Sequence, residues 1–244
     1  MLINHTLNTE SFTLDQLKNL PIPQALGRRH VIRPFSEDAE LMQDCLLDMG
    51  ASIRDQRYLV RFDDQQMPRQ MFGLAEIDLP QHNDPDYRLQ VGLRGSYDQT
   101  LPRGIALGSH VMVCSNLAFH GDSVIQTKQT TYVNQRLPAL MRSAVEQIPE
   151  MAESQSSFFD RLKNTPLSLA AGDHMLVEML RRGAISASQL GKALTEWSQP
   201  SYPEHISGGR TAWLLHNAVT EALKGNSLPM IWKKTRILTE YLEA

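Results

Sequence analysis

Residues 87–98 read Tyr-Arg-Leu-Gln-Val-Gly-Leu-Arg-Gly-Ser-Tyr-Asp, and this stretch decides the fold class. From the start of this stretch, the odd-numbered positions hold apolar residues: Tyr87, Leu89, Val91 and Leu93. The residues at even positions are mainly polar: Arg88, Gln90, Arg94, Ser96 and Asp98. Because side chains alternate across a strand, this pattern predicts a β-strand of an antiparallel sheet with one covered face and one polar face.

The period of the hydrophobic pattern changes along the chain. Strands are predicted over residues 52–62, 69–79, 87–98, 109–115 and 123–133. A helix whose apolar stripe contains Cys45 precedes them, and helical spacing takes over from about residue 135. The order predicts an α+β fold, with an N-terminal, mostly antiparallel β-sheet, a flanking helix and a C-terminal helical half.

We divide the chain where this period changes. Residues 1–135 form the sheet region and residues 136–244 a helical region that packs on it, in one composite domain. Residues 150–172 are rich in serine at first, and they are predicted to form a linker and a short helix. In the apolar stripe over residues 137–148, Leu140 lies at the middle and is expected to be buried.

Composition excludes several classes of protein. The chain has 244 residues, 41% hydrophobic and 21% charged, with a formal net charge of −3. A protein that coats duplex DNA by charge alone is usually strongly basic, so we do not expect this chain to belong to that class. No run of 18 apolar residues and no secretory signal is present, so we expect no membrane span and a location in the cytoplasm.

No standard catalytic motif is found: the sequence lacks a phosphate-binding loop, a nucleophile elbow and a metalloprotease motif. The eight histidines are dispersed. We therefore expect no catalytic residue, no metal and no cofactor, although an enzyme is not excluded.

One region resembles a known family. The matching residues are Arg94-Gly-Ser-Tyr-Asp98, Gly104, Gly108, the segment Val111–Asn116, Phe119, Lys128 and Thr130. A second match, Trp213-Leu-Leu-His-Asn217-Ala-Val-Thr-Glu221, follows later in the chain. Together they resemble the phage and plasmid family catalogued as "domain of unknown function 932", over roughly residues 30–135 and 205–243. Gly95 and Gln99 depart from the asparagine and lysine usual there.

The resemblance implies a context and no activity: a mobile genetic element in a bacterial host, often beside DNA-processing genes. It also marks motif residues whose role is either in binding or in holding the fold: Asp98, Asn116, Trp213, Asn217 and Glu221. On the predicted helix, Asn217 and Glu221 could reach the sheet and hold the segment around Arg94 in place.

Cations recur on the predicted polar strand faces. The candidate residues for binding nucleic acid or another anion are Arg57, Arg61, Arg88, Arg94, Ser96 and Lys128. If these faces are coplanar, they form a surface that suits a phosphate backbone. The alternative is a solvated face on which Arg94 pairs with Asp98, worth only about 0–1 kcal/mol when exposed.

Three functions stay open. The first is a non-enzymatic nucleic-acid-binding accessory of phage or plasmid replication or recombination. The second is a protein-binding inhibitor of a host defence system. The third is an enzyme that acts on a small anionic substrate through Arg94, Asp98 and a nearby histidine. We favour the first, with nucleic acid or a host protein as the partner, no membrane, and an oligomer as an open alternative.

The two cysteines, Cys45 and Cys114, are predicted to be free thiols. Neither has a second cysteine or a histidine at metal-ligand spacing, and a reducing cytoplasm disfavours a disulfide. Thiol titration of the denatured, non-reduced protein should therefore count two groups, and a count of zero would show a disulfide instead.

Overall fold

The chain folds as an α+β protein, as predicted. The computed structural model describes residues 8–80, 82, 87–111, 116–119, 125–127, 130–206 and 209–244. The strands are β1 (Thr9–Phe12), β2 (Ser52–Phe62), β3 (Pro68–Asp78), β4 (Tyr87–Ser96), β5 (Arg103–Val111), β6 (Asn116–Phe119) and β7 (Ile125–Thr127). The helices are α1 (Leu14–Lys18), α2 (Phe35–Asp48), α3 (Val133–Glu146), α4 (Ile148–Lys163), α5 (Leu169–Arg182), α6 (Ala187–Ser198), α7 (Ala212–Leu223) and α8 (Leu228–Glu243), with a short 3-10 helix at Pro203–Ile206.

All the strands form one antiparallel sheet in the order β1-β2-β3-β4-β5, with β6 and β7 both paired to β5. The predicted strands 52–62, 69–79 and 87–98 match β2, β3 and β4 within two residues. The later predictions were inaccurate. Strand β5 begins at Arg103, before the predicted start, and the prediction missed this because the strand contains glycines, which are typical of turns. Strand β7 is only three residues long. Part of the predicted strand 109–115 lies outside the described residues.

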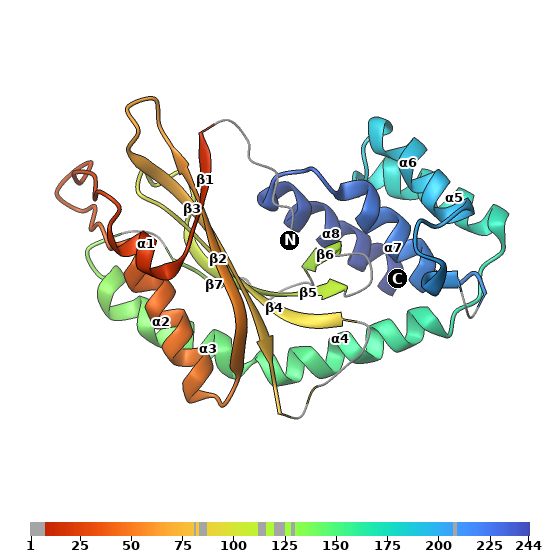
Figure 1. The fold of residues 1–244 in the computed structure, drawn as a ribbon, viewed down its shortest axis with the longest axis horizontal. Coiled ribbons are helices and arrows are strands. Elements are labelled where there is room, and N and C mark those ends of the chain that lie inside the picture. The colour runs from red at the N-terminus through yellow and green to blue at the C-terminus, as the bar shows by residue number, and fades with distance from the viewer. Residues whose placement is uncertain are drawn as a thin grey trace.

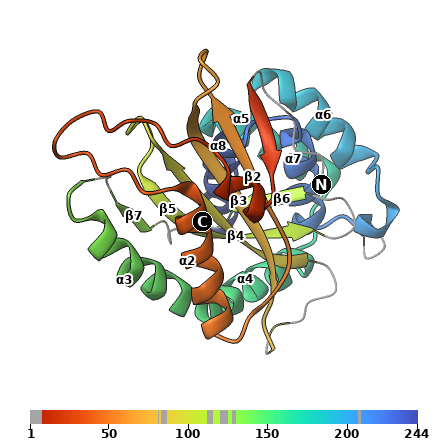
Figure 2. The ribbon, with the colours of Figure 1, turned by 60° about the vertical axis from the view of Figure 1, so that its left-hand side comes forward.

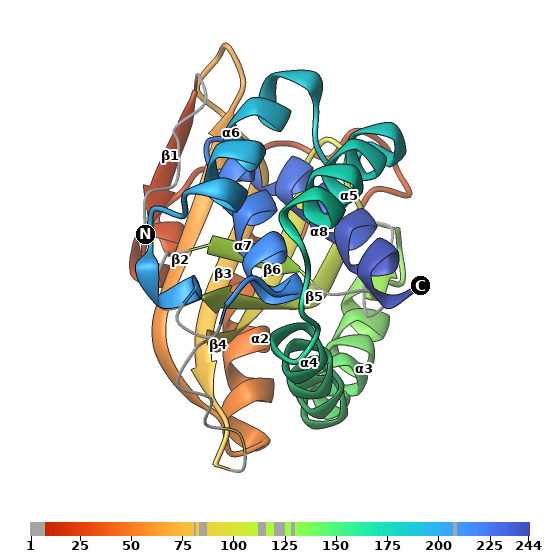
Figure 3. The ribbon, with the colours of Figure 1, turned by 90° about the vertical axis from the view of Figure 1, so that its right-hand side faces the viewer.

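The sheet is covered on both faces around β4 and β5. Helices α2, α3 and α4 lie against one face, and α5 to α8 lie on the other side (Figures 1 and 3). We call these the α2–α4 face and the α8 face. The α2–α4 face holds the main core, which extends from Leu17 in the sheet region to Trp213 in the helical region. The two predicted regions therefore share one core.

Helix α4 corrects the prediction of a linker in this part of the chain. It runs without a break from Ile148 to Lys163. Its buried side chains recur at helical spacing: Ile148, Ala152, Gln155, Phe158, Phe159 and Leu162. The serines that suggested a linker are spaced between these positions, where a helix tolerates polar side chains.

The C-terminal helices have a smaller core of their own, built around α5, α6 and α7. Trp197 of α6 is fully buried against α5, and its indole N–H donates to the carbonyl of Leu169 at 3.1 Å. A Cβ at Gly172 would lie 2.2 Å from the Trp197 ring, so only glycine fits there. In the part of the chain that the structure describes, no helix is long and apolar enough to cross a membrane.

Cys45 is a buried free thiol on the core side of α2, as expected, and its burial raises the pKa of the thiol. Cys114 lies outside the described residues.

The expectation for Leu140 was wrong. Helix α3 is rotated so that Val133, Leu137, Met141 and Ala144 are buried, while Leu140 is only partly covered. Leu137 and Met141 are 3% and 2% exposed. The centre of the buried stripe therefore lies one residue further along than the sequence pattern indicated.

This rotation gives a stability prediction for a neighbouring pair. Met141→Ala should lower the free energy of unfolding by about 2–5 kcal/mol, because it removes a buried side chain and leaves a cavity. Leu140→Ala should cost about 1.5 kcal/mol or less, because solvent and neighbouring side chains fill a partly exposed site. Urea denaturation of both variants measures the difference, and equal losses would contradict the observed rotation.

Candidate nucleic-acid interface

The strand register places the predicted arginines on one face of the sheet. Arg61 pairs with Gln70 in a row that continues to Ser96. The next row on the same face runs from Leu59 through Phe72 to Arg94. Because side chains alternate along each strand, Arg57 and Arg88 lie on this same α8 face. Lys128 lies outside the described residues.

The expectation of an open polar face was wrong over the central strands. Ile231 of α8 packs on Leu59 and Leu74, and Trp232 packs beside them with Phe72. Ser96 and Gln90 are 0% and 2% exposed. The physical reason is that β2 and β3 carry apolar side chains on this face too, and α8 buries them.

Ser96 is used inside the fold. Its hydroxyl donates to the carbonyl of Leu101 at 3.0 Å and accepts the N–H of the same residue at 2.9 Å. These two bonds close the turn that follows β4. Ser96 therefore shapes the loop and offers no exposed hydroxyl to a ligand.

Two of the predicted cations contact carboxylates of the protein. Arg88 contacts Asp78 at 2.8 Å and Glu76 at 3.4 Å, all three being largely buried. Arg57 contacts Asp55 at 3.4 Å, with both side chains about half exposed. Since an exposed pair contributes only about 0–1 kcal/mol, Arg57 remains available to a stronger anion, whereas Arg88 does not.

Arg94 and Arg61 have no acidic partner within the described residues. The Arg94 guanidinium lies 5.1 Å from the centre of the Trp232 ring, in a cation–π contact, and its Nε has no hydrogen-bond partner there. Its direct neighbours across the strands are Phe72 and Gly104, which are uncharged. Burial lowers the pKa of Arg94, as expected for a charge removed from water without compensation. Arg61 is exposed at the edge of the same face.

Asp98 does not pair with Arg94. It accepts hydrogen bonds from Arg69 and from the Thr100 side chain and backbone. Burial alone would raise the pKa of Asp98, but the bonds from Thr100 and Arg69 lower it below its ordinary value. The enzymatic alternative named Arg94 and Asp98 together with a nearby histidine, and in the described structure Asp98 contacts Arg69 and Thr100 and not Arg94.

The second motif also serves the fold. Asn217 donates to the carbonyl of Trp213 at 2.9 Å, within α7. Glu221 pairs with Lys192 of α6 and with Lys224, and so it ties helices together instead of reaching Arg94. Trp213 packs in the aromatic core near Phe159. The backbone of Asn116 begins β6, and its side chain lies outside the described atoms.

Sequence reasoning missed a buried ion pair on the opposite face. Arg103 of β5 and Asp38 of α2, both 1% exposed, contact each other, and Asp38 also accepts from Arg33 at 2.8 Å. Burial lowers the pKa of Arg103, and the nearby charge of Arg33 adds to this. The sequence carried no signal for the pair, because Asp38 has the position of an ordinary acidic residue in the first turn of a helix.

Among the described residues, no group of three histidine, cysteine, aspartate or glutamate side chains is placed to hold a metal ion. Comparison with known proteins adds no relative: no family model, no curated protein and no solved structure matches this chain. The family resemblance therefore stays a prediction.

The buried Arg103 and the half-buried Arg94 should respond differently to replacement by methionine, which keeps the aliphatic stem. Arg103→Met strands Asp38 in the core and should lower the free energy of unfolding by about 3–5 kcal/mol. Arg94→Met should change it by about 1 kcal/mol at most, since losing the cation–π contact is offset by removing a desolvated charge. Chemical denaturation tests both, and a loss near that of Arg103→Met would make Arg94 a structural arginine.

Proposed function

We propose that this protein binds nucleic acid through the α8 face of its sheet, as a non-enzymatic accessory of phage or plasmid DNA metabolism in the bacterial cytoplasm. One observation carries the proposal: the half-buried guanidinium of Arg94 has no carboxylate partner in the described structure. A partly desolvated cation is costly unless an anion approaches it, and a phosphate group neutralises arginine through charge-assisted hydrogen bonds.

The surroundings of Arg94 favour a nucleic-acid strand over a free small anion. Arg61 and Gln70 lie in the neighbouring row, so a second phosphate has a cation to contact. Phe72 and Trp232 are partly exposed beside Arg94, and aromatic rings of this kind offer stacking surfaces to unpaired bases. A single-stranded ligand matches this combination of cations and rings.

The electrostatics limit how tight such binding is. Among the described cations predicted for this face, Arg61 and Arg94 lack an acidic partner, and Arg57 is added when its exposed pair with Asp55 opens. With a net charge of −3, the chain as a whole does not attract a polyanion. We therefore expect modest affinity and a shallow dependence on salt, with about two to three phosphates contacted.

Protein binding is the second candidate, and it rests on a different surface. The segment between α1 and α2 extends away from the sheet (Figure 2). It exposes Ile22 and Leu26, which are 55% and 67% exposed, beside the exposed Arg28 and Arg29. Exposed apolar side chains next to arginines are typical of protein contact sites, which suits an inhibitor of a host defence protein.

The first proposal is tested with a fluorescently labelled oligothymidylate of about 20 nucleotides, a length that exceeds the site size of a typical single-strand binding fold. Arg61→Ala and Arg94→Met should each weaken binding at low salt, by about three- to tenfold. Each should also lower the slope of log affinity against log salt by about 0.7, since one phosphate contact is lost. Fluorescence anisotropy measures both quantities.

Arg142→Ala is the matched control, because it removes the same charge from an exposed site on α3, on the other side of the sheet. It should leave affinity and slope unchanged. If the wild-type protein does not bind the oligonucleotide at low salt, or if all three variants bind as the wild type does, the α8 face is not a nucleic-acid site. Protein binding by the segment between α1 and α2 then becomes the leading function.

A further inference from the structure

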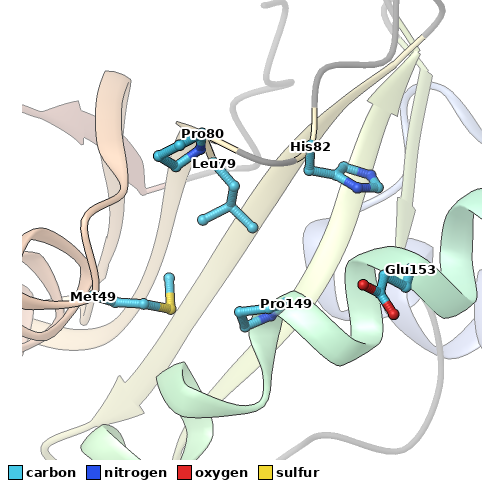
Figure 4. A pocket seen from close by; sticks show the side chains of 6 residues that line it. All are labelled: Met49, Leu79, Pro80, His82, Pro149 and Glu153. Atoms are coloured by element: carbon cyan, nitrogen blue, oxygen red, sulfur yellow. The ribbon is translucent and has the colours of Figure 1, made fainter.

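A small pocket lies on the other side of the molecule from Arg94. It has a volume of about 180 Å³ and opens between the end of α2, the segment after β3 and the start of α4 (Figure 4). The residues that line it are Met49, Leu79, Pro80, His82, Pro149 and Glu153. Nothing in the nucleic-acid proposal uses these residues, so the pocket is considered independently of it.

Four of the six lining residues have apolar side chains: Met49, Leu79, Pro80 and Pro149. Leu79 is 7% exposed and belongs to the main core, and Met49 is partly buried against that core. The two prolines have restricted backbones, and Pro149 lies in the first turn of α4. Because their backbones are already restricted, these two prolines lose little conformational entropy when an apolar group binds beside them.

The polar groups are gathered at one end. In Figure 4, His82 and Glu153 lie toward one side of the pocket and Met49 lies at the other. The His82 backbone N–H donates to the carbonyl of Leu79 at 3.0 Å, and its ring Nε2 is 2.9 Å from the hydroxyl of Tyr87. These contacts fix the imidazole at the pocket edge.

Glu153 carries the carboxylate of this pocket. Within the described residues its carboxylate has neither a hydrogen bond nor an ion pair, although it lines the pocket. A carboxylate beside an apolar wall repels anions and accepts strong hydrogen bonds from an ammonium group. The pocket thus combines the two features that recognise a small amphipathic cation.

We propose that this pocket binds a small primary amine with an apolar body. The hydrocarbon or aromatic part lies between Met49, Leu79 and Pro149, and the ammonium group donates to the carboxylate of Glu153. The edge of His82 bounds the polar end. This arrangement follows the general design of ligand pockets, in which apolar walls supply contact area and a few polar groups set orientation.

Isothermal titration calorimetry with two matched probes tests the proposal. 2-Phenylethylamine and 3-phenylpropionate share an aromatic ring and a short linker but carry opposite charges. The amine should bind the wild-type protein saturably, and the acid should not. Glu153→Gln should weaken binding of the amine by about tenfold, the loss expected when a charge-assisted hydrogen bond becomes a neutral one.

Asp160→Asn is the control, because it makes the same change of charge at an exposed site on α4 outside the pocket. It should bind the amine as the wild type does. Glu153 is itself exposed, so its variant should fold normally, and a thermal melt verifies this. The proposal is overturned if the amine does not bind, if the acid binds equally well, or if Glu153→Gln binds with wild-type affinity. None of these outcomes bears on the oligonucleotide experiment.

Discussion

Burial of both faces of the sheet around β4 and β5 is the constraint on which the charged side chains of this fold depend. A charge on these strands loses its water, so it needs either a partner or a ligand. On the α2–α4 face, Arg103 meets this need with Asp38, and Arg33 completes the cluster. On the α8 face, the described structure gives Arg94 the ring of Trp232 and no acidic side chain. The two arginines lie on adjacent strands and differ in what opposes them.

This difference separates a structural arginine from a candidate functional one. The pair of Arg103 and Asp38 joins β5 to α2 and leaves neither charge uncompensated. A cation–π contact contributes about 0.5–2 kcal/mol, which does not replace a lost hydration shell. The α8 face therefore holds an electrostatic cost that an anion would relieve. Local costs of this kind are expected where a fold binds its ligand.

The strands were predictable because their information is local. Residues 87–93 alternate clearly, so the sequence alone located β4, although the predicted strand ended two residues late, and β2 and β3 were located as well. The glycines that interrupt β5 and the serines of α4 carry local preferences that the tertiary packing overrides. For the same reason, the side of α3 that is buried was predicted only to within one residue.

The covering of the sheet was not predictable, because it depends on residues far apart in the chain. The sequence indicated a polar face from Arg88, Gln90 and Arg94, but Ile231 and Trp232 of α8 determine how much of that face is open. The ion-pair partner of Asp98 was also not predictable from the sequence, because Asp98 lies close to Arg94 in sequence but pairs with Arg69 of the neighbouring strand β3.

The pocket was not predictable from the sequence for the same reason. Met49, Leu79 and Pro149 are ordinary residues at the ends of three elements, and only their meeting point creates a cavity. Glu153 resembles any exposed acidic residue on a helix until that cavity is seen beside it. Within the described residues, Arg94 and Glu153 thus both lack a side chain of opposite charge as a partner, and they lie on opposite sides of one sheet with opposite sign. The two proposals therefore name ligands of opposite charge, and each can be tested without disturbing the other site.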